Sequence, residues 1–275
     1  MGKFSMKVLI LSRRPSLYSP RRLLEEFEKA GHTSVLLDPD LGDECRQFEP
    51  QVIVPRFGAW KFEESLSLLQ SFEKRRVPCV NRPNALRDAR HKWIAYLTLR
   101  EAELPVLPTS CLTKAELPTQ YPYVVKIPDL CKGEGVFLIR KHEDRLALLG
   151  PAEVPEWVMQ PYMAYAEGRD RRFLVTREEG IIAAIEREAA AGDFRSNLSL
   201  GGRGRIHEPS ALEKRLVMDA LDVFGLHVAG VDLMLTPQGP IINEVNGCPG
   251  LEGLEKITGV NAAAAYVRQA EALLR

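Results

Sequence analysis

The chain has 275 residues, of which 45% are hydrophobic and 27% charged, so it is long enough for two or three lobes with cores of their own. Lysine plus arginine equals aspartate plus glutamate at 37 each, and this balance favours neither nucleic acid nor a membrane as partner. Five scattered cysteines form no CxxC pair, and no apolar run approaches the roughly 20 residues of a membrane helix. We therefore expect a cytoplasmic protein with reduced thiols.

The first part of the chain alternates predicted strands and helices. Strands are expected at residues 7–11, 35–37, 52–54 and 79–80, with helices at 20–30 and near 62–75. This order predicts a parallel sheet covered by helices. A helix over about 84–101 and a proline-containing segment at 104–109 then lead to a strand-rich middle.

The middle contains candidate phosphate-binding residues. Lys126 lies inside an apolar strand expected at 123–127, and the loop 128–135 joins it to a second strand at 136–140. A lysine in a buried strand is costly without an anion, so Lys126 either reaches a phosphate or extends its amine to water. We favour phosphate because Gly133 and Gly135 would let backbone amides approach the same ligand. The loop matches neither GxxxxGK[ST] nor GxGxxG, so it is a weak signal by itself.

Residues 231–246 predict a β-hairpin around a Thr-Pro-Gln-Gly-Pro turn with a loop of three to five residues. A turn centred on Gln238 sets Asp232 opposite Glu244, with Asn246 on the same face. Facing carboxylates repel unless a positive charge lies between them, and this oxygen set suits Mg²⁺ or Mn²⁺. The alternative is that the two carboxylates are solvated residues on an exposed face.

A series of motifs follows in one order along the chain. The most specific strings are DFRSN at 193–197, AGVDL at 229–233, NEVN at 243–246 and PGLEG at 249–253. The other segments of the series are 12–13, 17–19, 82–86 with Lys92, Lys126, and 201–202. From about Met6 to the last helix, this series closely resembles the RimK-like branch of the ATP-grasp carboxylate–amine ligases. Without this context Lys92 would be interpreted as a solvated helix residue.

The resemblance implies a mixed α/β and α+β protein with an ATP-grasp fold. A Rossmann-like N-terminal lobe is expected at residues 1–82, a central lobe with the phosphate loop at 83–165, and a C-terminal lobe with the metal site at 166–275. ATP would lie between the last two lobes, and the N-terminal lobe would help to form the acceptor site.

The resemblance also implies roles for individual residues. Asp232 and Glu244 would bind one Mg²⁺ (or Mn²⁺), and Glu244 with Asn246 a second. Arg195 would be the catalytic residue that stabilises the reacting oxyanion. The expected nucleotide-binding residues are Lys92, Lys126, Gly133, Gly135, Gln160, Pro161, Tyr162, Asp170, Arg195, Ser196 and Asn197, with Asp170 directed at the ribose.

Two residues depart from the family pattern. Pro161 replaces the glutamate usual beside Gln160 and removes a backbone N–H from the segment that borders adenine. Leu130 replaces a small residue early in the phosphate loop, with Cys131 and Lys132 after it. These departures put nucleotide preference and the motion of the loop in question.

The expected function is ATP-dependent, ADP-forming ligation of an amino acid, with glutamate favoured, to a carboxylate acceptor through an acyl phosphate. The acceptor is a protein C-terminus, a carrier protein, or a small acid or peptide. Six arginines around the Arg195 loop are either ordinary solvated charges or a sign that the acceptor or the amino acid is anionic, and their crowding favours the second interpretation: Arg169, Arg171, Arg172, Arg187, Arg203 and Arg205.

Two alternatives stay open. One is a nucleotide-binding regulatory or assembly protein that keeps the fold without ligase turnover. The other is an enzyme that phosphorylates or carboxylates a small acid on the same scaffold. Whether the chain is a monomer or a homo-oligomer is not predicted. The five histidines show no metal-binding spacing, and Cys248 is interpreted as a packing residue rather than a nucleophile.

Overall fold

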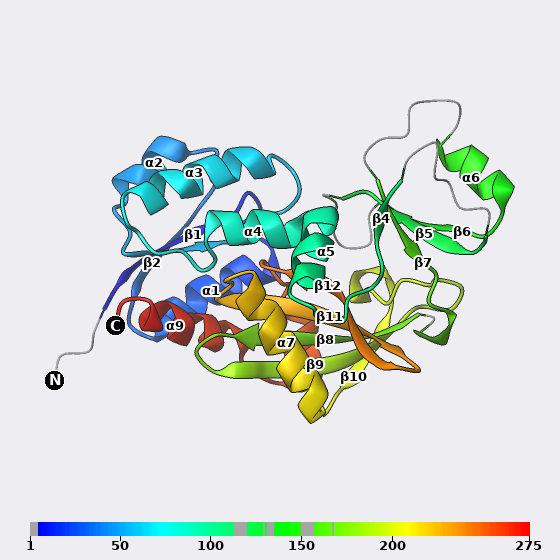
Figure 1. Ribbon diagram of the computed structural model, residues 1–275. Coiled ribbons are helices and arrows are strands. Elements are labelled where there is room, and N and C mark those ends of the chain that lie inside the picture. Colours follow the sequence, from blue (N-terminus) through cyan, green and yellow to red (C-terminus); the bar gives the residue numbers. More distant parts are fainter. Residues whose placement is uncertain (1–4, 113–119, 129, 131–134, 150–156, 167) are drawn as a thin grey trace.

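The computed structural model describes residues 5–112, 120–128, 130, 135–149, 157–166 and 168–275. Within these residues the chain forms three successive sheets, with helices packed around the first and third (Figure 1). The three sheets divide the strands among N-terminal, central and C-terminal segments of the chain. The predicted mixture of α/β and α+β structure is confirmed.

The N-terminal sheet is parallel, in the order β2–β1–β3, as predicted. Its strands are β1 (Lys7–Leu11), β2 (Thr33–Leu37) and β3 (Val52–Pro55), and its helices are α1 (Tyr18–Lys29), α2 (Gly42–Gln47) and α3 (Phe62–Lys74). Gly31 follows α1 with a φ of +92°, a conformation that favours glycine. The strand expected at 79–80 is only an isolated bridge between Cys79 and Ile53, and the short α2 was not predicted.

The single helix expected at 84–101 is wrong. The segment forms two helices, α4 (Pro83–Arg90) and α5 (Lys92–Glu101), separated by His91 with an extended ψ of 107°. The His91 ring Nδ1 accepts a hydrogen bond from the Ile94 backbone N–H at 3.4 Å and so caps α5. This break places Lys92 at the first residue of a helix that packs against β12 (Gly239–Asn246).

The central sheet is antiparallel, in the order β4–β7–β5–β6. It comprises β4 (Ser110–Cys111), β5 (Tyr123–Lys126), β6 (Val136–Ile139) and β7 (Val158–Pro161), with α6 (His142–Leu149) after β6. A small separate core of Leu112, Tyr123, Val125 and Ile139 lies on this sheet.

The C-terminal sheet is antiparallel, in the order β10–β9–β8–β11–β12. Its first four strands are β8 (Arg169–Thr176), β9 (Gly180–Glu188), β10 (Arg203–Ile206) and β11 (Val228–Thr236). The helices of this part are α7 (Ala211–Val223), α8 (Glu252–Thr258) and α9 (Ala262–Ala272), with short 3₁₀ turns at Ala164–Ala166 and Leu198–Leu200. The helix α7 begins with a capping box between Ser210 and Glu213.

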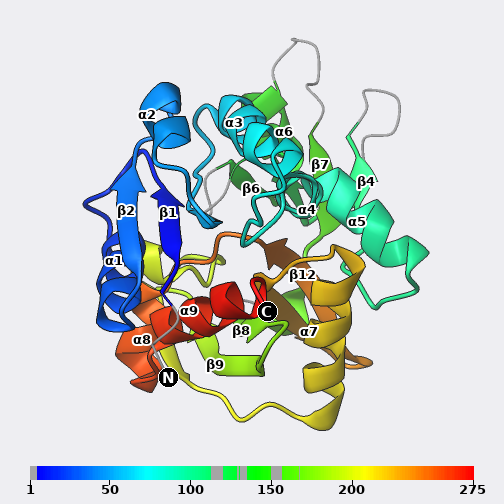
Figure 2. The ribbon, with the colours of Figure 1, turned by 90° about the vertical axis from the view of Figure 1, so that its left-hand side faces the viewer.

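The N-terminal and C-terminal sheets share one hydrophobic core. Leu23 and Phe27 of α1 belong to the same buried cluster as Leu174 of β8 and Tyr266 of α9. The helices α1 and α9 lie side by side (Figure 2). These two parts of the chain are therefore packed together by buried apolar surface, whereas the central sheet has its own small core.

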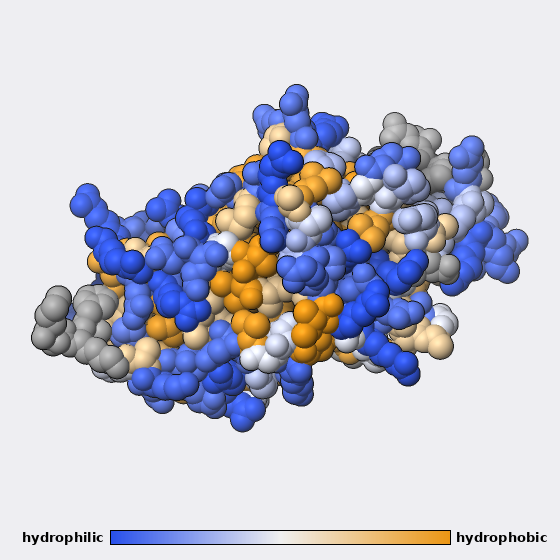
Figure 3. Space-filling view, turned by 90° about the horizontal axis from the view of Figure 1, so that it is seen from below, coloured by the Kyte–Doolittle hydropathy of each residue, from blue (hydrophilic) through white to orange (hydrophobic). Residues whose placement is uncertain are grey.

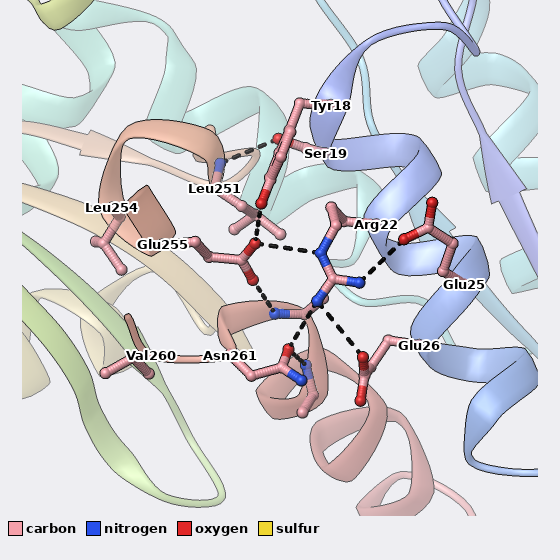
Figure 4. A network of polar contacts seen from close by, with 12 residues as sticks. Tyr18, Ser19, Arg22, Glu25, Glu26, Leu251, Leu254, Glu255, Val260 and Asn261 are labelled. Atoms are coloured by element: carbon pink, nitrogen blue, oxygen red, sulfur yellow. Dashed lines mark hydrogen bonds and ion pairs between the residues drawn. The ribbon is translucent and has the colours of Figure 1, made fainter. Parts of the chain in front are cut away.

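A polar network joins α1 to α8 and to the start of α9 (Figure 4). Tyr18 donates its hydroxyl to Glu255 at 2.6 Å, and Arg22 donates to Glu255 at 3.3 Å and to Asn261 at 3.3 Å. The Ser19 hydroxyl accepts from the Leu251 backbone N–H at 3.0 Å. These bonds fix the segment that follows β12 against the N-terminal sheet.

The surface seen from below is mainly hydrophilic, with hydrophobic residues gathered in an irregular band across its middle (Figure 3). The large apolar side chains that are exposed on the molecule include Trp60, Ile206 and Leu212. No helix among the described residues has the length and apolar character to span a membrane.

Candidate active site

The hairpin of β11 and β12 brings Asp232 opposite Glu244, as predicted, but by a different route. Thr236 pairs with Gly239, so the loop is only two residues long, shorter than expected. A two-residue loop alone would set Asp232 opposite Asn243. A β-bulge takes up Asn243 and restores the pairing of Asp232 with Glu244.

Asp232 is buried and held by two arginines. Arg172 donates to both of its carboxylate oxygens at 2.7 and 2.6 Å, and Arg187 donates to Oδ2 at 2.8 Å. Burial alone would raise the pKa of Asp232, but the two guanidinium groups hold that pKa at about 2. Asp232 is thus a stable carboxylate, and its Oδ1 accepts only one of these bonds, which leaves it a free lone pair.

The other two expected metal ligands are also available to a cation. The Glu244 side chain makes no hydrogen bond or ion pair with any residue that the structure describes. The Asn246 side-chain oxygen accepts from the Cys248 backbone N–H at 2.8 Å and keeps a second lone pair. Carboxylate and amide oxygens suit a hard divalent cation, so the residues present fit Mg²⁺ or Mn²⁺.

Two lysines, one from α5 and one from β5, approach the hairpin. Lys126, at the end of β5, donates to the Asn243 side-chain oxygen at 3.2 Å. Burial lowers the pKa of Lys126 to about 8, although the Glu244 carboxylate opposes this shift. Lys92, at the start of α5, donates to the backbone oxygens of Pro128 (3.1 Å) and Leu130. The two ammonium groups therefore lie beside the predicted metal ligands.

The structure partly describes the predicted phosphate loop. Gly133 lies outside the described residues, as do Cys131 and Lys132. Gly135 has a φ of +65°, and a Cβ there would lie 2.8 Å from the Leu130 side chain. Glycine is therefore required at 135 both by the backbone conformation and by the close approach of Leu130.

Two adjoining cavities meet at these residues. One has a volume of about 880 Å³ and lies between the central and C-terminal sheets. The other, about 770 Å³, lies between α4, α5, residues Phe57 and Phe62 after β3, and the end of β12. The wall that the two cavities share is made of Lys92, Lys126, Leu130, Gln160, Asn243 and Glu244. Both cavities thus open onto the same pair of lysines and the same carboxylate.

Sequence comparison assigns this geometry to a family. A model of the RimK-like ATP-grasp domain matches residues 109–270, and a model of the RimK pre-ATP-grasp domain matches residues 6–86. The chain belongs to the RimK-like ATP-grasp family. The resemblance seen in the motif series and the predicted ATP-grasp fold with its N-terminal lobe are confirmed.

Relatives of this RimK-like chain cover nearly its whole length. A probable alpha-L-glutamate ligase of Xanthomonas oryzae pv. oryzae (strain MAFF 311018) is 33% identical over 294 residues, covering 98% of this chain and 99% of the relative. A probable alpha-L-glutamate ligase of Pasteurella multocida (strain Pm70) is 31% identical over 288 residues, covering 94% and 91%.

Solved structures show the same fold at low sequence identity. The D-alanine–D-alanine ligase of Bacillus anthracis complexed with ATP has a TM-score of 0.74 at 17% identity, with 97% of this chain and 96% of that chain covered. The ATP-grasp ligase PsnB complexed with a minimal precursor has a TM-score of 0.72 at 19% identity, with 98% and 99% covered. These structures show that the RimK-like chain has the fold of the ATP-grasp ligases.

The predicted adenine-binding residues of this RimK-like protein line the larger cavity. Gln160, Pro161 and Tyr162 lie at the end of β7 on its wall. Gln160 donates to the Thr109 hydroxyl at 2.9 Å, and its own side-chain oxygen is buried without a hydrogen-bond partner among the described residues. A buried acceptor without a donor is costly, so this oxygen is available to an N–H group of a ligand.

The remaining predicted residues line the same cavity but have partners already. Both oxygens of Asp170 accept from Arg187, and Asp170 is buried, so its carboxylate serves the arginine network rather than standing free. Arg195 donates to Asp193 at 3.0 and 2.8 Å, next to Ser196 and Asn197 on the cavity wall. The Asp193 contact preorients Arg195 at the lip of the cavity.

Most of the arginines expected to select an anion are neutralised. Arg171 pairs with Glu186 and Glu213, Arg205 pairs with Glu186, and Arg172 and Arg187 pair with aspartates. Arg169 lines the larger cavity and makes no hydrogen bond or ion pair with a described residue. Of the six arginines, Arg169 and Arg203 are therefore the two that still support the selection of an anionic substrate.

Sequence reasoning missed Asn243. Under strict strand alternation it faces away from Asp232 and Glu244, and only the bulge brings its oxygen to Lys126. Its position inside the NEVN string was the single available signal.

Proposed function

We propose that this protein is an ATP-dependent ligase that forms an amide bond between a carboxylate acceptor and an amino acid, with glutamate as the amino acid. The observation that carries the proposal is the wall shared by the two cavities. It presents two lysines and the Glu244 carboxylate to both sides, so a nucleotide in one cavity and an acid in the other would meet there.

The larger cavity suits ATP. Its lining includes the Gln160 oxygen and the end of β7, which suit a base, and Lys92 and Lys126, which suit a polyphosphate. Pro161 and Leu130, the two residues that depart from the family pattern, line this cavity and do not close it.

The oxygen ligands Asp232, Glu244 and Asn246 would hold Mg²⁺ or Mn²⁺, with Glu244 between two ions. Bound there, the metal would neutralise phosphate charge. The two arginines on Asp232 fix the orientation of that carboxylate, and the bulge at Asn243 fixes Glu244 beside Lys126. The protein therefore supplies a preorganised oxygen set together with two cationic side chains.

The reaction follows from the chemistry of carboxylates, which do not condense with amines at neutral pH. An acceptor carboxylate oxygen attacks the γ-phosphorus of ATP, the bond to ADP breaks, and an acyl phosphate forms. The amino nitrogen of glutamate then attacks the acyl carbon and loses a proton, and inorganic phosphate leaves. Lys92 and Lys126 balance the charge of the transferred group, and Arg195 stabilises the oxyanion of the second step.

The names of the curated relatives support glutamate, because both relatives described above are probable alpha-L-glutamate ligases. The acceptor is a protein C-terminus, a carrier protein, or a small acid or peptide. PsnB has been solved with a precursor peptide, which keeps a peptide acceptor among these options.

The test is a screen of ADP release in which each amino acid is combined with peptide, carrier-protein and small-acid acceptors, followed by the mass of the product. The proposal predicts ADP release with glutamate and a product that has gained one glutamate less one water. Nucleotide binding without ADP release from any pair would favour the regulatory or assembly alternative. A product that has gained phosphate or carbon dioxide would favour the third class.

A further inference from the structure

A third cavity lies away from the candidate active site. It has a volume of about 790 Å³ and lies between the end of α3, the segment 76–82, the start of β11 and the chain end after α9. Its lining residues are Glu73, Arg76, Val77, Pro78, Cys79, Arg82, His227 and Leu273. None of these residues lines either of the two active-site cavities.

His227 is one of the polar side chains that line this cavity. Its Nδ1 atom is buried and has no hydrogen-bond partner among the described residues. Burial, with Arg177 and Arg82 nearby, lowers the pKa of His227 to about 4. A neutral imidazole with an unused buried nitrogen is unfavourable unless a ligand contacts it.

The cations around His227 are not balanced by the protein. The side chains of Arg76 and Arg82, both exposed residues, form no hydrogen bond or ion pair with a described residue, while Arg177 is paired with Asp222 at 2.8 Å. Glu73 is the one carboxylate among the described lining residues. The cavity therefore presents two guanidinium groups and an imidazole, against a single carboxylate at its edge.

We propose that this cavity binds a small dianionic oxyanion such as phosphate between Arg76, Arg82 and His227. Guanidinium groups donate to phosphate through paired N–H groups. Burial is the main reason that the pKa of His227 is low, and the neighbouring guanidinium groups lower it further. A bound dianion next to the ring would favour the charged imidazole, which could then act as a third donor. Three donors around one cavity match a tetrahedral dianion better than a monocarboxylate. The binding does not depend on ligase activity.

One residue connects this cavity to the candidate active site. Asn81 is fully buried, and its side-chain oxygen accepts from the backbone N–H groups of His227 and Val228. Its side-chain nitrogen donates to the backbone oxygens of Val228 at 2.7 Å and Gly247 at 2.8 Å. Gly247 follows Asn246, so a shift of His227 reaches the end of β12 through a single side chain.

The test follows the imidazole signal of His227 by NMR during titration with inorganic phosphate at neutral pH. The protein carries labelled histidine, and His227→Asn identifies the signal. All titrations use a Lys126→Ala background, which removes a cation of the active site from the measurement. The expected result is a saturable shift of the His227 signal toward the protonated form, with sulfate acting similarly and acetate more weakly.

The decisive variant is Arg76→Ala combined with Arg82→Ala. Loss of two charge-assisted contacts should weaken phosphate binding about tenfold or more. The matched control is Arg75→Ala, because Arg75 neighbours Arg76 but stacks on Phe72 and does not line the cavity. The proposal would be overturned if the His227 signal did not change on addition of phosphate, or if the double variant bound phosphate with unchanged affinity. Binding of acetate as tight as that of phosphate would also overturn it.

A second measurement tests the connection through Asn81. Phosphate should change the amide hydrogen exchange of residues 246–250 in the Lys126→Ala background and not in the protein that also lacks Arg76 and Arg82. Exchange that is the same with and without phosphate would remove the link to the active site.

Discussion

Asp232 and Arg172 lie directly opposite each other on β11 and β8 and are joined by two hydrogen bonds of 2.7 and 2.6 Å. Arg187, on β9, adds a third bond to the same carboxylate. Asp232 is therefore both a predicted metal ligand and a structural partner of two arginines, whereas Glu244 has no described protein partner.

This difference predicts unequal effects of two amide substitutions. Asp232→Asn leaves the buried Arg187 with one carboxylate in place of two and should lower the free energy of unfolding by about 3 kcal/mol. Glu244→Gln should leave that free energy almost unchanged and abolish ADP release. Denaturant unfolding and ADP release measured on both variants, with Glu101→Gln as an exposed control, test this contrast. Full activity in Glu244→Gln would contradict the metal assignment.

Lys126 should act mainly in nucleotide binding. Lys126→Ala removes a cation from the wall between the cavities and should weaken ATP binding by about tenfold or more, as measured by calorimetry. Lys141→Ala, which changes an exposed lysine beyond β6, is the control. If the variant binds ATP as tightly as the unmodified protein, Lys126 is not a phosphate ligand.

Arg195 should act in turnover rather than in binding. Its planar fork is oriented by Asp193 toward the larger cavity, and lysine would keep the charge but lose this geometry. Arg195→Lys should retain ATP affinity and lose on the order of 10²-fold in kcat. Asp193→Asn should lower kcat in the same direction by a smaller factor. Equal kcat values for Arg195→Lys and the unmodified protein would exclude the oxyanion role.

Glu213 predicts a pH dependence of stability. Burial alone would raise its pKa, but the Ser210 backbone N–H and Arg171 bring that pKa down to about 2. Because the folded-state pKa lies below the unfolded value of about 4.3, the ionised carboxylate stabilises the fold above pH 4.3. This stabilisation is lost as the pH falls from about 4.3 toward 2.

The corresponding variant is Glu213→Gln. It should be less stable than the unmodified protein by about 2 kcal/mol at pH 7, and the difference should shrink as the pH falls through that window. Urea unfolding at a series of pH values measures it. A difference that stays constant from pH 7 to pH 2 would show that the charge of Glu213 does not contribute.

The sequence predicted what depends on local pattern. Short apolar runs were sufficient to predict the three parallel strands of the first sheet and the presence of the hairpin at 231–246. The pairing of Asp232 with Glu244 was also predicted, but from a longer loop than the one observed. Motif spacing was sufficient for the family. The limits of the three lobes and the roles of the individual site residues remain predictions.

What the sequence could not predict depends on contacts between distant segments. The bulge at Asn243 compensates for a shorter loop, and neither feature can be recognised from the pattern of apolar and polar residues. The break at His91 depends on a ring that caps the next helix, which a helical pattern does not reveal. The pairing of Arg172 and Arg187 with Asp232 requires three strands to be aligned. The sequence therefore showed a cluster of arginines but not their ion-pair partners.

The central claim is that a carboxylate receives the γ-phosphoryl group at the wall of Lys92, Lys126 and Glu244. The most direct measurement uses an acceptor labelled with ¹⁸O in its carboxylate, with glutamate and ATP, and determines the isotope content of the inorganic phosphate released. Transfer through an acyl phosphate predicts that each amide bond formed places one acceptor oxygen in phosphate. Phosphate that contains no ¹⁸O while labelled acceptor is consumed would contradict the account.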